Sequence, residues 1–129
     1  MTPAEVTPYR ESVTGVRALF AFGLTQDFFR EERARIAPIM EALKAGFTDL
    51  EARFGVRVLG TLDDDESMVG ARETWPWTCY ILAEVPDHAA VARVCNLLRE
   101  IEIGDARLWR YLRVEARVGR PLFFAEPPA

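Results

Sequence analysis

Two short segments of the sequence concentrate aromatic side chains that could hold a flat ligand. Trp77 and Tyr80 lie in and just after a Trp-Pro-Trp motif, and Trp109 and Tyr111 belong to a Trp-Arg-Tyr motif nearer the C-terminus. Indole and phenol rings stack on flat molecules and also donate hydrogen bonds, so these four residues are candidate ring contacts. Tyr80 and Tyr111 are in addition candidates for moving a proton. Packing in the core or against a second subunit is the alternative use of the same rings.

Two arginines in the C-terminal segment could fix a carboxylate group. Arg113 and Arg117 follow the second aromatic motif, in a stretch that alternates like a strand. A guanidinium group donates two parallel hydrogen bonds to a carboxylate, so an arginine near aromatic rings suits a small aromatic acid. The alternative is an ion pair of either arginine with Glu115 or with an acidic residue of a second subunit.

An acidic run at residues 63–66 could supply a general base or oxygen ligands for a hard cation. The run lacks the glycine and the ligand spacing of a calcium-binding loop, so no metal site is predicted. Asp64 and Asp65 are its candidates for proton transfer, because the loop is expected to pass the mouth of a cavity. A solvated turn is the alternative, since like charges repel each other and favour exposure.

Several other chemistries lack the residues that they need. His88 is the only histidine, so a catalytic triad or a transition-metal site built on several histidines is not expected. The eight glycines are scattered and form neither a phosphate-binding loop nor a dinucleotide motif, so we expect no tightly bound cofactor. Cys79 and Cys95 lie at apolar positions of periodic segments and are expected to be buried free thiols.

The charge pattern argues against large polyanionic partners. The formal net charge is -4, and acidic and basic residues are interleaved along most of the chain. Nucleic acids and anionic membranes instead attract concentrated basic surfaces. The sequence also shows no secretion signal and no apolar stretch of the roughly 20 residues that a membrane span requires. We therefore expect a cytoplasmic protein that binds neither nucleic acid nor membrane.

Hydrophobic periodicity predicts the elements that must position these residues. Alternation indicates strands at residues 16–24, 56–62, 75–85 and 108–118. Spacing of three and four indicates one helix of about 20 residues between 27 and 54 and a second helix from 88 to 101. The order β-α-β-β-α-β is that of a ferredoxin-like α+β sandwich, a four-stranded antiparallel sheet with two helices on one face. This domain is expected to span residues 15–122, between an N-terminal tail or arm (1–14) and a C-terminal tail (123–129).

The last expected strand indicates that the second face of the sheet is also covered. Alternation places Trp109, Tyr111, Arg113, Glu115 and Arg117 on the face away from the helices. This mixture is too aromatic for bulk water and too charged for a dry core. A second copy of the sheet could cover it, so we expect a homodimer of the dimeric α/β-barrel type with a partly polar cavity.

Three segments of the sequence resemble a known family. They are LGTLDDDESMVG (59–70), WPWTCYILAEV (75–85) and LWRYLRVEARVGRPL (108–122). They resemble the IacB-like accessory proteins of bacterial indole-3-acetic acid degradation clusters, over about residues 16–122. The resemblance implies a cytoplasmic protein of auxin catabolism that acts on or holds an indole-acetate intermediate, and it assigns no catalytic residues. A weaker similarity, in strand order and in the aromatic fourth strand, is to darcynin-like and other dimeric α/β-barrel proteins, which include cofactor-free monooxygenases and isomerases.

Three functions remain open on these observations. The first is an enzyme without a tightly bound cofactor, a monooxygenase, isomerase or dehydratase in which Tyr80, Tyr111 or an acidic-loop carboxylate moves a proton. The second is a non-catalytic module that binds an unstable intermediate and delivers it to a partner enzyme of the same pathway. The third is an interaction domain whose aromatic face is only a seam between subunits.

Overall fold

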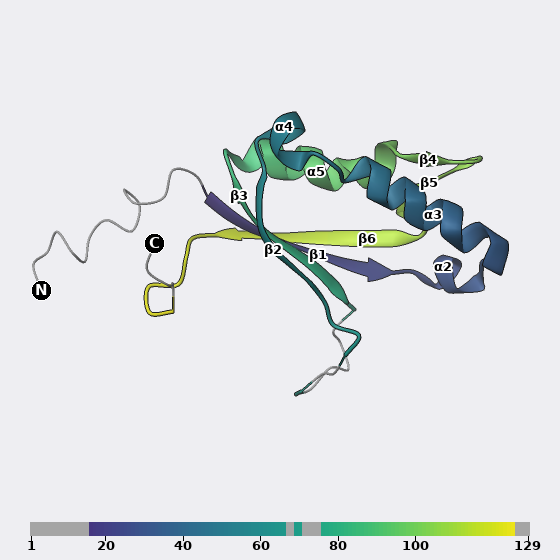
Figure 1. Cartoon of the computed structure of the whole chain (residues 1–129), viewed down its shortest axis with the longest axis horizontal. Coiled ribbons are helices and arrows are strands. Elements are labelled where there is room, and N and C mark those ends of the chain that lie inside the picture. Colours follow the sequence, from purple (N-terminus) through teal and green to yellow (C-terminus); the bar gives the residue numbers. More distant parts are fainter. Residues whose placement is uncertain (1–15, 67–68, 71–75, 126–129) are drawn as a thin grey trace, which may run out of the picture.

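A four-stranded antiparallel sheet is the centre of the computed structural model, which describes residues 16–66, 69–70 and 76–125. The first strand along the chain pairs with both the third and the last, so strands far apart in the sequence lie side by side. This is the strand order of the predicted ferredoxin-like sandwich. Across the sheet the strands are β2 (Arg57–Asp63), β3 (Cys79–Val85), β1 (Val16–Leu24) and β6 (Leu112–Gly119) (Figure 1).

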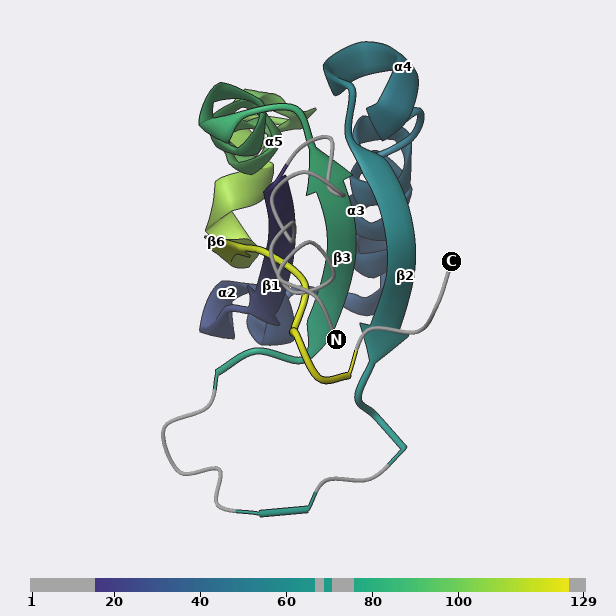
Figure 2. The ribbon, with the colours of Figure 1, turned by 90° about the vertical axis from the view of Figure 1, so that its left-hand side faces the viewer.

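The helices lie on one face of this sheet, as predicted. Figures 1 and 2 show the two long helices packed along the same side of the strands. No helix of the described residues covers the other side, which we call the open face. None of the described helices is long and apolar enough to cross a membrane. The helices are α2 (Gln26–Arg30), α3 (Arg33–Gly46), α4 (Leu50–Phe54) and α5 (His88–Glu100).

The core lies between the sheet and the two long helices. Ala18, Phe20 and Phe22 alternate along β1 on the helix side and are buried against residues such as Ile39 of α3 and Leu98 of α5. Fully burying a side chain of the size of Phe20 contributes about 1.5–3 kcal/mol. These contacts hold the helices in place over the sheet. They therefore also determine the position of any hollow between the helices and the sheet.

The first helical stretch was predicted as one helix and is three. Glu31 is extended (ψ 149°) after α2, and Asp49 has left-handed dihedral angles (φ 51°) before α4. A β-carbon at Gly46 would collide with the side chain of Ile101, so α3 ends in a close approach between backbone and core. The apolar spacing continues from α3 into α4, which bury Ile39 and Leu50, whereas α2 has no buried residue. The break between α3 and α4 therefore does not disturb the pattern.

The last predicted strand is also shorter than expected. A 3₁₀ turn, η2 (Leu108–Arg110), occupies its first residues, and β6 begins at Leu112. A two-stranded hairpin, β4 (Glu102–Ile103) and β5 (Ala106–Arg107), precedes the turn, with Gly104 at a positive φ of 59°. Trp109 and Tyr111 thus lie before the strand and not in it. The third strand likewise begins at Cys79, after Trp77, and Trp75 lies outside the described residues.

Candidate functional site

A hollow of about 720 Å³ opens between α3 and the end of the sheet where β2 leads into the acidic loop. We call it the α3 pocket. Much of its lining is apolar, and the rings of Phe22 and Phe47 meet edge to face inside it, with centroids 5.5 Å apart. Such a lining suits a flat apolar ligand. The apolar lining residues include Phe22, Met40, Leu43, Phe47, Ile81 and Leu112.

Three of the four residues predicted to move a proton line the α3 pocket: Tyr80, Asp64 and Asp65. The Tyr80 hydroxyl lies 3.1 Å from Asp64 Oδ2 and 3.1 Å from the carbonyl oxygen of Trp77, and its single proton can be donated to either. The backbone N–H of Asp64 donates to the carbonyl of Thr78 (2.9 Å), which holds the carboxylate beside β3. Three of the residues that the sequence singled out therefore border the same cavity.

Trp77 contributes to this site through its main chain. Its carbonyl is the acceptor beside Tyr80, and its indole is only half-buried. The segment passes directly over β1, since a β-carbon at Gly23 would lie 2.5 Å from the Pro76 carbonyl oxygen. Position 23 therefore requires glycine, because the backbone of the Pro76 segment approaches β1 too closely to leave room for a side chain.

Cys79 is a further polar group of the α3 pocket. Burial raises the pKa of its thiol, a hydrogen bond with Thr78 works in the opposite direction, and the charges of Asp63, Asp64 and Asp65 raise the pKa further. A thiol with a raised pKa is mostly protonated at neutral pH and is a weak nucleophile. Cys79 therefore contributes a small, largely uncharged side chain to the lining of the pocket.

Lys44 is exposed on α3 and also lines the α3 pocket, although the sequence did not single it out as a site residue. It is the only lysine of the sequence. It stands one turn beyond Met40 and three residues before Phe47, both of which line the pocket as well, so the helical spacing of its neighbours was the available signal. Lys44 makes no ion pair with another described residue.

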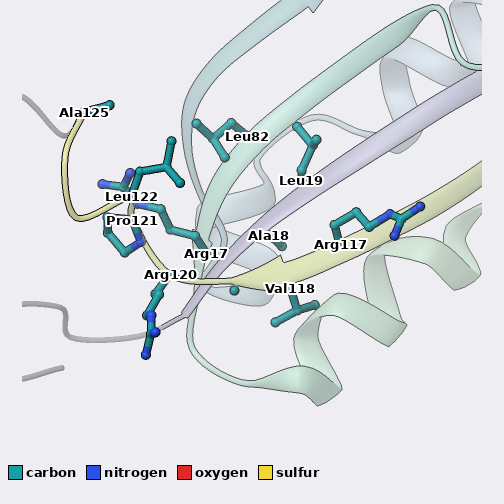
Figure 3. A pocket seen from close by; sticks show the side chains of 11 residues that line it. Arg17, Ala18, Leu19, Leu82, Arg117, Val118, Arg120, Pro121, Leu122 and Ala125 are labelled. Atoms are coloured by element: carbon teal, nitrogen blue, oxygen red, sulfur yellow. The ribbon is translucent and has the colours of Figure 1, made fainter. Parts of the chain in front are cut away.

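A second hollow, of about 400 Å³, lies on the open face of the sheet (Figure 3). Arg17 of β1, Arg117 of β6 and Arg120 line it together with apolar residues that include Leu19 and Leu82. Arg117 donates through Nε to Glu115 Oε2 (3.1 Å), so the predicted alternative of an ion pair is present. In Figure 3 the guanidinium groups of Arg117 and Arg120 point in different directions, and they do not converge on one point.

Arg113, the other predicted carboxylate anchor, lines neither hollow. Its guanidinium lies over the ring of Trp109, 4.3 Å from the centroid, and donates to the main-chain carbonyls of Trp109 and Leu112. Arg99 approaches the same ring at 4.9 Å. Trp109 is therefore enclosed by arginines beside α5 and is not part of a ligand wall with Tyr80.

Tyr111 is the clearest correction to the predicted site. It is completely buried, and its hydroxyl donates to Glu31 Oε2 at 2.5 Å. The 3₁₀ turn has three residues per turn, so Tyr111 follows Leu108 into the core instead of alternating onto the open face. The four predicted ring contacts and their arginine anchor are consequently not assembled in one place.

The described residues contain no group of three or more histidine, cysteine, aspartate or glutamate side chains that could hold a metal ion. The acidic residues 63–65 thus lie along the rim of the α3 pocket without forming such a cluster.

A scan against protein-family models and a search of curated proteins both find no match to the sequence. Among solved structures, a crystal structure of a protein described as chlorite dismutase-like aligns with 21% sequence identity and a TM-score of 0.47. The alignment covers 84% of this chain and 45% of that protein. The chain therefore spans less than half the length of the structure that it matches.

Proposed function

We propose that the protein binds a small aromatic acid of the indole-3-acetate type in the α3 pocket and takes part in the breakdown of such acids without a tightly bound cofactor. The observation that carries the proposal is that Tyr80, Asp64 and Asp65 line one largely apolar cavity. Its volume of about 720 Å³ falls in the range of small-molecule sites. The resemblance to IacB-like proteins supports the choice of ligand and a role in the cytoplasm.

The Tyr80–Asp64 pair supports a proton-transfer role. A ligand proton that moves to the Tyr80 oxygen can be matched by the transfer of the hydroxyl proton to Asp64, which lies 3.1 Å away. The net change is one proton moved from the ligand to the Asp64 carboxylate. Such a transfer could take part in an isomerisation or a dehydration, or in an oxidation by a cofactor-free monooxygenase.

Non-catalytic binding and delivery to a partner enzyme is the competing function, and the same pocket supports it. Cys79 has a raised pKa, and the apolar walls bind a ring without requiring chemistry. A largely apolar cavity suits an apolar intermediate that is held and then handed on.

One experiment separates the two functions. Purified protein is mixed, without added cofactor, with indole-3-acetate or with one of its hydroxylated or oxindole derivatives. Calorimetry measures binding of each compound, and mass spectrometry shows whether the compound is changed. Turnover that is lost in Tyr80→Phe, with binding retained, establishes the enzyme. Binding with no change in the mass of any compound establishes the delivery module. If none of the compounds binds, both functions are excluded.

We also propose that the protein is a homodimer joined through the open face. Leu19 and Leu82 are opposite each other near its middle and are each more than one third exposed. Arg17, Arg117 and Glu115 on the same face give it charges of both signs. A second copy turned by a two-fold axis could bury the leucines and pair these charges between subunits.

A further inference from the structure

The open face carries a group of arginines at one of its corners, on the side of β1 and β6. Arg17 and Arg117 lie on the face itself, and Arg120 follows the end of β6 (Figure 3). All three line the open-face hollow, and no acidic residue is among its described lining. We call this region the basic corner. Two glutamates of the same face are each paired with an arginine, Glu84 with Arg57 and Glu115 with Arg117.

The diagonally opposite corner, on the side of β2, is acidic. Tyr80 alternates with Leu82 along β3 and therefore projects to the open face, where it contacts the Asp64 carboxylate. Residues 64–66 are all acidic and make no ion pair with another described residue. Arg113 begins near the same end of the sheet, but its guanidinium is stacked over an indole ring beside α5. We call this region the acidic corner.

Each corner also exposes apolar side chains. Phe123 and Phe124 follow β6 at the basic corner, are 83% and 72% exposed, and contact each other edge to face. Leu62 is 60% exposed at the acidic corner, opposite Tyr80 in the sheet. A fully buried phenylalanine covers roughly 150–250 Å², so the two rings could supply about 230–390 Å² of the roughly 800 Å² that each partner buries in a standard interface.

A second copy of the chain matches both corners at once. In a two-fold dimer, residue i of one subunit contacts residue j of the other and j contacts i, so one match between unlike corners is made twice. Placing each corner on its own copy would instead bring arginine against arginine and carboxylate against carboxylate, which is unfavourable. Leu19 and Leu82 lie between the corners and would meet the other subunit near the axis.

We infer that the two subunits of the proposed dimer associate with unlike corners in contact, so that Arg120 and the Phe123–Phe124 pair of each subunit cover the Tyr80–Asp64 pair of the other. The inference rests on the proposed dimer and adds to it that each subunit completes the site of its partner. The Tyr80–Asp64 pair is then closed on the side of the open face by the second chain.

Charge reversal tests this contact on the full-length protein. Arg120→Glu and Asp65→Lys should each raise the dissociation constant of the dimer about tenfold or more, because each change creates two like-charge contacts in a symmetric interface. The two changes together restore unlike charges and should return the constant to within about threefold of the unchanged protein. Sedimentation over a dilution series measures all four dissociation constants.

A second double variant is the matched control. Arg93→Glu combined with Asp65→Lys has the same net charge as the restoring pair, but Arg93 is exposed on α5, in the helix layer. This combination should therefore stay as weak a dimer as Asp65→Lys alone. Circular dichroism of each variant shows that the fold is retained.

A spin label shows which corners meet without relying on charge. The label is attached at Arg120→Cys in a copy whose native cysteines are replaced by serine, and this copy is mixed with ¹⁵N-labelled protein of unchanged sequence. We expect the amide signals of Leu62 and Tyr80 to broaden in the ¹⁵N-labelled subunit. Broadening of Arg17 and Glu84 in their place would mean that like corners meet.

The possible results separate this inference from the proposed dimer. If the unchanged protein is a dimer but Arg120→Glu and Asp65→Lys leave it intact, the contact between unlike corners is wrong and the dimer stands. Equal restoration by Arg120→Glu and by Arg93→Glu also overturns the contact, because net charge alone would then explain it. If the unchanged protein is a monomer, the proposed dimer and the inference fail together.

Discussion

The two cysteines give a comparison inside one molecule. Cys79 lines the α3 pocket, whereas Cys95 lies on α5 and does not. Burial raises the pKa of both thiols, so both should react slowly with iodoacetamide at neutral pH and faster as the pH rises above the ordinary value of about 8.5. We predict that a ligand in the pocket slows alkylation of Cys79 several-fold and leaves Cys95 unchanged, as measured by peptide mass spectrometry.

The acidic residues 63–65 provide the control for this prediction. The charge of Asp65 raises the pKa of Cys79, so Asp65→Asn should lower that pKa and speed alkylation of Cys79 at a fixed pH without an effect on Cys95. Equal protection of both cysteines by the ligand would mean that it stabilises the whole fold and does not occupy the α3 pocket.

Tyr111 and Tyr80 allow a second matched comparison. Tyr111 is completely buried and its hydroxyl donates to Glu31, whereas Tyr80 is only partly buried and its hydroxyl lies beside Asp64. Tyr111→Phe should lower the free energy of unfolding by about 1–2 kcal/mol, because a carboxylate loses its buried donor. Tyr80→Phe should cost less than half as much. Urea denaturation of both variants checks the prediction, and equal losses would contradict it.

The residues that could be predicted from the sequence are those whose neighbours kept a regular pattern. Tyr80 alternates within a true strand, and Asp64 follows the paired strand directly, so their meeting was predictable. Tyr111 could not be placed, because a 3₁₀ turn of three residues replaced the expected alternation. Lys44 was not singled out, because a charged residue on the exposed side of a helix looks the same in the sequence whether or not it borders a pocket.

At the scale of elements, periodicity predicted the order of strands and helices but not where the first helical stretch breaks. The interruptions depend on dihedral angles and on long-range contacts that the apolar spacing does not contain. One is the extended backbone at Glu31, whose side-chain carboxylate accepts the hydrogen bond from Tyr111 eighty positions away. The other is the close approach of Gly46 to Ile101 at the end of α3. Pro38 lies inside α3 without ending it, so this proline did not mark the position of either break.

The turn around α4 leads to a prediction about backbone strain. Asp49 adopts left-handed angles (φ 51°), which cost a residue with a β-carbon about 1 kcal/mol, and Gly55 ends α4 with a φ of 73°. Asp49→Gly should therefore raise the midpoint of urea unfolding slightly, whereas Gly55→Ala should lower stability by about 1 kcal/mol. If Asp49→Gly is destabilising instead, the aspartate side chain contributes more than the strain costs.

At the scale of the whole molecule, the sequence predicted that the open face would be too aromatic to remain in water. The aromatic part of that prediction is wrong, because Tyr111 is in the core and Trp109 lies beside α5. What the open face presents instead is leucine beside arginine and glutamate. The case for a second subunit therefore rests on a surface of mixed apolar and charged residues. Side-chain alternation alone could not have shown that these residues, and not the aromatic ones, occupy the open face.

A single substitution near the middle of this face tests the proposed dimer. Leu82 lies opposite Leu19, so Leu82→Asp would place one carboxylate from each copy in a desolvated seam, and two unpaired buried charges cost several kcal/mol. We expect the unchanged protein to sediment as a dimer over a wide range of concentrations and Leu82→Asp to sediment as a monomer with unchanged circular dichroism. Phe29→Asp is the control, because Phe29 is 65% exposed on α2, away from the open face. A monomer before any substitution, or a dimer that persists in Leu82→Asp, would show that the open face does not join two copies.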